Sequence, residues 1–227
     1  MFGKKKPAEK KSTARKPTAK KAGGESLPHA PARKRSSATP SPKGDTPLKS
    51  PASSTSEFIY ISNEAHYDQV IERIKTVKKT LWIGTADIKD LYVKDGRGTK
   101  PLLEVLSDLA KRGVEIRLIH AKKPGPAFRQ DFDKYPAPLI EGMERVLCQR
   151  VHFKIIVFDL KAAYVGSANL TGAGLGMKGE NTRNFEAGIL STNRDFVKNA
   201  TEQFDSVWLV AHCKDCKRKE FCGDLIG

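Results

Sequence analysis

The first 56 residues lack almost everything that a folded domain needs. No aromatic residue lies between Phe2 and Phe58. This stretch holds 8 of the chain's 13 prolines, and its 14 Lys and Arg residues outnumber 3 acidic ones. Such a segment buries too little apolar surface to offset the entropy of ordering it. We therefore expect a disordered Lys/Pro/Ser-rich basic tail over residues 1–56, one domain over 57–211 and a Cys-rich C-terminal segment over 212–227.

The chain also lacks any apolar run near the roughly 18 residues that are needed to cross a bilayer. Its opening residues, Met1 to Lys6, have no apolar stretch of the kind that signal peptides contain. We expect a cytoplasmic protein without a transmembrane segment. The nucleus or nucleoid is the alternative location, because Arg33-Lys34-Arg35 has the composition of a nuclear address.

Acidic residues are too few to balance the basic ones, and the formal net charge is +15. Most of this excess, +11, lies in the tail. A flexible cationic tail binds polyanions by releasing their counterions, so nucleic acid is the expected partner. An anionic membrane surface is the alternative partner. A third interpretation is a tail that only keeps the protein soluble or acts as a linker.

Apolar periodicity from residue 58 onward predicts alternating strands and helices. Strands are expected over 58–62, 81–85, 114–119, 145–148, 152–158, 162–167 and 185–190. Helices are expected over 63–77, 102–110 and 195–210. A polar loop is expected around residues 95–98, and 122–137 reads as a loop with at most one helical turn. This order predicts an α/β fold in which helices flank a parallel or mixed sheet.

One stretch combines residue types that phosphate chemistry requires. His152 and Lys154 are two residues apart, so on a strand their side chains would project from the same face. Asp159 follows, and Ser167 and Asn169 then add a hydroxyl and an amide near the same edge of the sheet. We predict a phosphate-binding site from these groups. The alternative for each is structural, because a single histidine on a strand is more often a core or surface residue.

The joint pattern H-x-K-x4-D followed by G-S-x-N resembles the signature of the phospholipase D superfamily. The likeness extends upstream to residues 102–119 and downstream to Asn184-Phe185-Glu186, and spans about residues 58–211. It implies a metal-independent phosphodiesterase in which His152 attacks phosphorus and forms a phosphohistidine.

The resemblance also implies a role for each remaining residue of the motif. Glu186 would orient the His152 ring, while Lys154, Ser167 and Asn169 would bind the nonbridging phosphate oxygens. Asp159 is part of the motif and is counted among the candidate catalytic residues. Its role stays open between tuning the charge of the site and capping a turn.

The chain lacks a second copy of this motif, whereas the family's active site needs two. One histidine attacks while the other protonates the leaving oxygen. The resemblance therefore implies a homodimer with the active site across its two-fold axis. The expected function is an endonuclease acting on DNA or RNA. A phospholipase D acting on lipid headgroups and a noncatalytic nucleic-acid-binding module are the alternatives.

Cysteines are few, but three of the four lie close together near the C-terminus. The pattern Cys213-x2-Cys216-x5-Cys222 has the short spacing of metal ligands, and it resembles the iron–sulfur centre of some unrelated DNA-processing nucleases. We predict a structural iron–sulfur cluster or zinc ion held by Cys148, Cys213, Cys216 and Cys222, with His212 as the alternative to Cys148. No cofactor is expected for catalysis. The other interpretation is a reduced basic segment in which the lysines matter more than the sulfur atoms.

Overall fold

The computed structural model describes residues 57–89, 91–135 and 141–222, so the expected tail over 1–56 lies outside the described residues. The strands are β1 (Phe58–Ser62), β2 (Thr80–Thr85), β3 (Tyr92–Asp95), β4 (Gly98–Pro101), β5 (Glu115–His120), β6 (Met143–Leu147), β7 (Ile155–Phe158), β8 (Ala162–Gly166) and β9 (Ala187–Ser191). The α-helices are α1 (Glu72–Ile74), α2 (Leu102–Lys111), α3 (Pro126–Asp133) and α5 (Arg194–Trp208). The π-helix η1 (Tyr67–Ile71) precedes α1, and η2 (Glu180–Thr182) and η3 (Lys219–Phe221) are short 3-10 helices.

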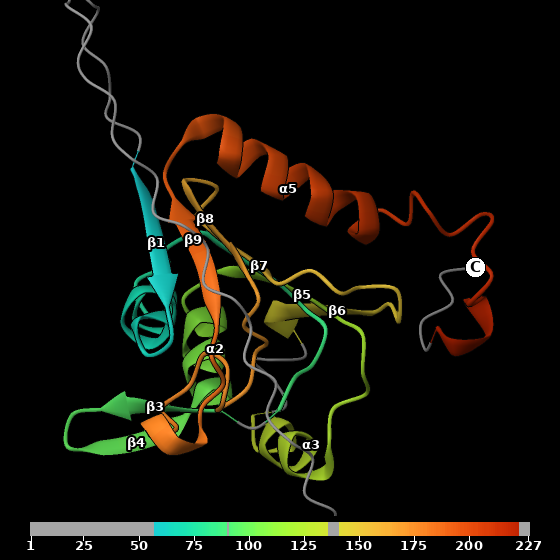
Figure 1. Cartoon of the computed structure of the whole chain (residues 1–227). Helices are drawn as coiled ribbons and strands as arrows, with labels where there is room; N and C mark the ends of the chain where they lie inside the picture. Colours follow the sequence, from blue (N-terminus) through green and yellow to red (C-terminus); the bar gives the residue numbers. More distant parts are fainter. Residues whose placement is uncertain (1–56, 90, 136–140, 223–227) are drawn as a thin grey trace, which may run out of the picture. The chain divides into compact units, whose positions relative to one another are not determined.

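A mixed sheet with the strand order β1-β9-β8-β7-β2-β5-β6 forms the centre of the domain (Figure 1). Strands β2, β5 and β6 run parallel to one another, while β7, β8, β9 and β1 pair antiparallel. This topology confirms the predicted α/β fold with a mixed sheet flanked by helices. Two segments that read as loops are ordered elements instead, the hairpin β3–β4 and the helix α3.

The sheet separates two apolar cores, and Figure 1 shows α2 and α5 on opposite sides of it. Leu102, Leu106 and Leu109 recur at helical spacing, so α2 buries one stripe against the first face. The helix ends where Gly113 adopts a φ of +80°, a conformation that glycine adopts without a steric penalty. On the second face Phe204 of α5 is fully buried, and its removal to alanine would cost about 3–5 kcal/mol.

The antiparallel order brings particular strand ends to the same edge of the sheet. The C-terminal ends of β1, β2, β5, β6 and β8 meet the N-terminal ends of β7 and β9 there. We call this edge the site edge. The opposite edge, which carries the turn between β7 and β8, is the turn edge.

Candidate functional site

The site edge brings together most residues of the predicted constellation. His152 and Lys154 lie just before β7, Ser167 and Asn169 follow β8, and Glu186 immediately precedes β9. The registers Ile155↔Val165 and Gly166↔Gly188 place these three segments next to one another across the sheet. The pairing of strands therefore assembles groups that are up to 34 residues apart in the sequence.

The expectation that His152 and Lys154 lie within a strand is wrong. Strand β7 begins at Ile155, three residues later than expected. His152 is exposed, whereas Lys154 is 8% exposed and its Nζ donates to the His152 carbonyl oxygen over 2.8 Å. Between them Phe153 packs over Gly84, where a Cβ would come within 2.3 Å of the ring. The His152 ring therefore lies at the surface, just before the strand begins.

The Glu186 carboxylate is held firmly at the site edge. Ser167 Oγ donates to Glu186 Oε2, and Asn184 Nδ2 donates to Oε1 over 3.0 Å. The backbone of Glu186 is fixed on both sides by Asn63, whose Oδ1 accepts from the Glu186 N–H and whose N–H donates to the Glu186 carbonyl oxygen. In the described part of a single chain, no hydrogen bond reaches the ring of His152. In this structure the Glu186 carboxylate therefore accepts hydrogen bonds from Ser167 and Asn184 and, within the described residues, none from the His152 ring.

Asn169 is oriented by residues that sequence reasoning did not assign to the site. Its Oδ1 accepts from the Asp87 N–H over 3.0 Å and from Thr85 Oγ1 over 3.4 Å. Both lie at or just after the end of β2, where polar residues follow an apolar strand. Because Oδ1 is occupied by donors, the Asn169 NH₂ group is the end that remains for an anionic ligand.

A buried histidine behind Glu186 was also missed. His66 is fully buried, its Nδ1 lies 2.9 Å from the Asn63 carbonyl oxygen, and its ring meets Tyr164 edge-on at 5.5 Å. Burial lowers the pKa of His66, against the opposing effects of the Asn63 hydrogen bond and the Glu186 charge. The ring is therefore neutral near pH 7. In the sequence, the position of His66 shortly after β1 was the only indication that it could lie near the site. Its ring partner Tyr164 and the neighbouring Glu186 come from remote segments.

Asp159 lies at the turn edge, away from the other motif residues. Its carboxylate accepts hydrogen bonds from the backbone N–H groups of Lys78, Lys79 and Thr80, over 2.7–3.2 Å. Burial opposes its charge, but these three donors outweigh burial and lower the pKa of Asp159. Asp159 itself has a φ of +52° in the tight turn to β8. Its contacts tie that turn to the start of β2.

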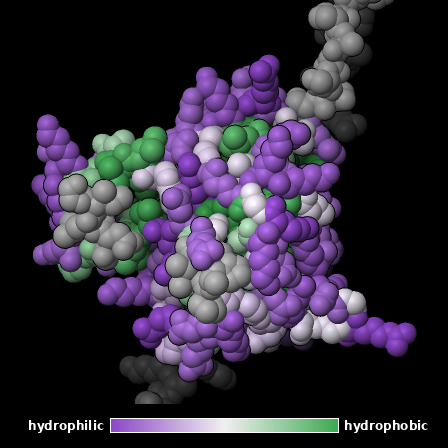
Figure 2. Space-filling view, turned by 180° about the vertical axis from the view of Figure 1, so that it is seen from behind, coloured by the Kyte–Doolittle hydropathy of each residue, from purple (hydrophilic) through white to green (hydrophobic). Residues whose placement is uncertain are grey.

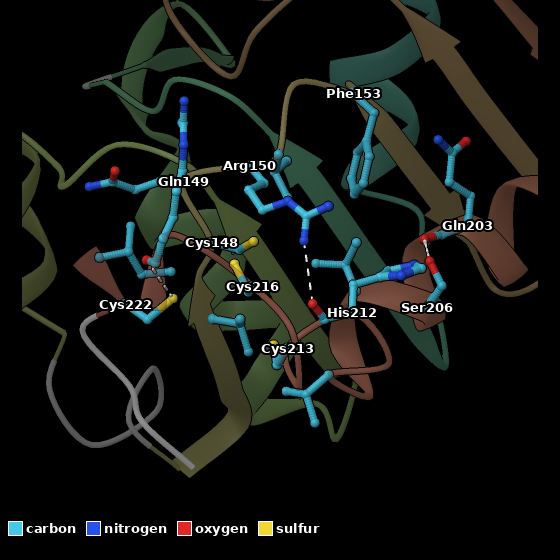
Figure 3. Close-up of a pocket in the computed structure, with 16 residues that line it drawn as sticks. Cys148, Gln149, Arg150, Phe153, Gln203, Ser206, His212, Cys213, Cys216 and Cys222 are labelled. Carbon is cyan, nitrogen blue, oxygen red and sulfur yellow. Dashed lines mark hydrogen bonds between the residues drawn. The ribbon is translucent and has the colours of Figure 1, made fainter. Parts of the chain in front are cut away.

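All four cysteines line one cavity of about 250 Å³ (Figure 3). Cys148 follows β6, and the other three come from the C-terminal segment. Within the described residues, however, no three histidine, cysteine or acidic side chains already lie close enough together to hold a metal ion. The predicted ligands therefore share a cavity without forming a coordination shell.

The C-terminal segment also borders the predicted nucleophile. A second groove, of about 660 Å³, is lined by His152, Arg150, Lys217 and Arg218 together with neighbouring side chains. Arg150 Nη1 donates to the carbonyl oxygen of His212 over 3.3 Å and so links the His152 segment to the C-terminal segment. Three cations thus stand beside the exposed imidazole.

The family model described as cardiolipin synthase, PLD-like domain, matches residues 70–208, which is more than half of the chain. The chain belongs to this phospholipase D-like family, as the motif predicted. No curated protein matches it. None of the helices in the described ranges combines the length and apolar character of a membrane span.

Several solved structures are similar to the chain at low identity. NucT from Helicobacter pylori is 15% identical with a TM-score of 0.47, over 66% of this chain and 95% of NucT. Nuc from Salmonella typhimurium, a phospholipase D family member, is 17% identical with a TM-score of 0.49, over 67% of this chain and 94% of Nuc. Phosphatidylserine synthase from Haemophilus influenzae Rd KW20 is 15% identical with a TM-score of 0.43, over 67% of this chain and 40% of the synthase.

Proposed function

We propose that this protein is a metal-independent phosphodiesterase that cleaves DNA or RNA internally, with His152 as the nucleophile. The observation that carries the proposal is the exposed His152 ring at the same sheet edge as Lys154, Ser167, Asn169 and Glu186, in a chain of the phospholipase D-like family. An imidazole nitrogen attacks without a metal when preorganised donors stabilise the charge of the transition state.

In the proposed reaction a ring nitrogen of His152 forms a P–N bond as the ester P–O bond breaks. A second histidine gives the leaving oxygen its proton, and water later hydrolyses the P–N bond to return the free ring. In the free protein Lys154 and Ser167 donate to acceptors within the chain. On substrate binding they donate to the nonbridging phosphate oxygens instead. Lys154 leaves the His152 carbonyl oxygen, and Ser167 turns from Glu186, which then accepts from the His152 ring.

Asp159 takes no part in this proposed chemistry. Its three backbone donors occupy the carboxylate at the turn edge, where it keeps the β7–β8 turn against β2. Of the two roles that the motif leaves open, the proposal therefore assigns Asp159 the structural one. A positioning role of this kind would affect stability more than the chemical step.

A second copy of the chain supplies the second histidine in this proposal. Exposed apolar side chains lie on β1 and β9 and reach the site edge: Phe58 is 57% exposed, Tyr60 73%, Ile189 39% and Phe185 96%. Tyr60 and Ile189 are direct partners in the sheet, and Phe185 precedes Glu186. A surface continuous with the site and apolar in character suits a two-fold interface.

Light scattering tests the dimer with one variant and one control. Tyr60→Arg should yield a monomer and lose turnover, because a charge in the centre of an apolar interface is desolvated without a partner. Tyr92→Arg is the matched control, since Tyr92 is an exposed tyrosine on the separate β3–β4 hairpin. A wild-type chain that is monomeric while active would contradict the shared active site.

Nucleic acid is the favoured substrate because the net charge is +15 and because Arg150, Lys217 and Arg218 line the groove beside His152. Such cations bind phosphates without reading sequence. A phospholipid headgroup is the second candidate, because the cations in the groove beside His152 would bind its phosphate equally well. The same phosphohistidine chemistry serves either diester.

One assay separates these substrates. The full chain and His152→Ala are incubated, without free divalent ions, with single-stranded DNA, duplex DNA, RNA and phospholipid vesicles. Nucleic-acid cleavage that persists with chelator and disappears in His152→Ala is the expected result. Headgroup release alone would identify a lipase, and binding without turnover would identify a binding module. The phosphohistidine is detected with a substrate whose scissile phosphate is radiolabelled. The reaction is quenched without acid, because acid hydrolyses the P–N bond, and the label bound to the protein is measured.

A further inference from the structure

All four cysteines of the chain line one cavity, although they come from two remote segments. Cys148 follows β6, while Cys213, Cys216 and Cys222 belong to the C-terminal segment, more than 60 residues later. Figure 3 shows the labelled cysteines around the same opening, with Arg150 and His212 next to them. Cys213, Cys216 and Cys222 are close in sequence, so the placement of Cys148 beside them is the feature that calls for a physical reason.

Apolar burial does not hold the C-terminal segment in place. Leu209 is 68% exposed, Val210 40% and Phe221 48%. Figure 2 shows a patch of hydrophobic residues at the surface on one side of the molecule. The segment consists of short turns, and its backbone hydrogen bonds are largely local, such as Cys216 N–H to the Cys213 carbonyl oxygen over 3.2 Å. A segment of this kind needs a cross-link to keep one conformation.

We propose that Cys148, Cys213, Cys216 and Cys222 bind a thiolate-ligated metal centre, a zinc ion or an iron–sulfur cluster, that fastens the C-terminal segment to the end of β6. Soft thiolates select these metals, and the C-x2-C turn presents two sulfur atoms from one loop, as closed structural sites require. On binding, each thiol loses its proton to solvent as its sulfur bonds to the metal.

The centre assembles as the segment closes over the cavity. Although no three described ligand groups lie at metal-binding spacing, metal binding to cysteine-rich segments is commonly coupled to their ordering. The charge also fits, because Arg150 and Arg218 line the cavity, and Lys214 and Lys219 lie nearby in the sequence. These cations offset the excess negative charge of four thiolates on one centre.

A centre at this position stabilises the wall of the groove that contains His152. Cys216 and Arg218 line both the cysteine cavity and this groove. A metal bound by Cys216 would therefore also hold this wall of the groove in place. Four thiolates fill the coordination sphere, which leaves no open position for a catalytic water. The centre is therefore structural and is separate from the metal-independent chemistry proposed above.

Metal analysis of the purified full chain tests the centre without any activity assay. The chain is prepared anaerobically in reductant, and zinc, iron and acid-labile sulfide are measured per chain together with the visible absorption spectrum. About one zinc per chain, or about four irons with equal sulfide and visible absorption, is the expected content. If neither co-purifies, the reduced chain is titrated with Zn²⁺ and, separately, reconstituted with iron and sulfide.

Single substitutions identify the ligands. Cys216→Ser and Cys148→Ser should lose the bound metal, while Gln149→Ala and His212→Ala, both altered at the cavity wall, should retain it. No stoichiometric metal even after reconstitution overturns the proposal, as does metal that survives both serine substitutions. Loss in His212→Ala with retention in Cys148→Ser overturns the ligand set. A disulfide between two cysteines of the C-terminal segment that persists in the preparation with reductant, found by mass spectrometry, also overturns the proposal.

Discussion

The two edges of the sheet treat polar residues of the same motif in opposite ways. At the turn edge, every oxygen of Asp159 accepts backbone hydrogen bonds, and the carboxylate serves the fold. At the site edge, the His152 ring is exposed and the Asn169 NH₂ group remains for a ligand. A polar group whose hydrogen bonds are all satisfied stabilises the structure, whereas a polar group with free bonding capacity can act on a substrate. Strand β7 alone separates these two roles.

The sharpest test of this contrast is His152→Ala. We expect turnover to fall by at least about 10³-fold, because the variant has no group to form the covalent bond. The unfolding free energy should change by less than about 0.5 kcal/mol, since the side chain is exposed. Lys161→Ala, an exposed residue at the turn edge, is the control for the chemistry and should leave turnover unchanged. Residual turnover near the wild-type rate would remove His152 as nucleophile.

Glu186→Gln should have the next largest effect. The amide oxygen can still accept from Ser167, but the NH₂ group that replaces the other oxygen cannot accept from Asn184. The charge that would orient and stabilise the His152 ring is also lost. We expect kcat to fall by about 10²-fold with a small change in KM. Steady-state kinetics at saturating substrate measures this split. A change confined to KM would assign Glu186 to substrate binding instead.

Asp159→Asn should affect stability and leave the chemistry nearly intact. Asparagine tolerates the left-handed φ of +52° but provides no charge for the three N–H donors. We expect the unfolding free energy to fall by about 1–2 kcal/mol in urea titrations at pH 7. Turnover of the folded variant should remain within about twofold of wild type. A large loss of kcat in a stable variant would place Asp159 in the catalytic site after all.

The stability difference between wild type and Asp159→Asn should depend on pH with a defined sign. The folded pKa of Asp159 lies below its ordinary value of 3.8, so its contribution is fully present above the unfolded pKa. It is lost as pH falls through the folded pKa. Urea titrations between pH 7 and pH 3 should therefore show the two proteins converging below about pH 4. A difference that is constant with pH would mean that the charge of Asp159 does not contribute.

Most elements of the fold could be predicted from periodicity in the sequence. Leu102, Leu106 and Leu109 predicted α2, and Gly113 predicted its end. The hairpin β3–β4 and the helix α3 were read as loops, because their residues are polar or follow prolines and local patterns there are weak. The hairpin and the helix are stabilised by tertiary packing, since Val93 and Phe128 are buried in the core of the domain.

The candidate site could be predicted in type but not in arrangement. The pattern around His152 and Lys154 indicated phosphate chemistry, and the family match agrees with it. The partners Thr85, Asp87 and His66 were missed, because each comes from a strand end that is remote in sequence. No spacing rule could link them before the strand order was known.

The alternation of strands and helices, the family and the kinds of side chain at the site depend on local periodicity and residue identity, so they could be read from the amino-acid sequence. Which groups meet depends on the three-dimensional arrangement. Strand pairing sent His152 and Asp159 to opposite edges and brought Cys148 to the cavity of the C-terminal cysteines. The physical reason is that contacts between remote segments follow from strand order and burial, which no local pattern encodes.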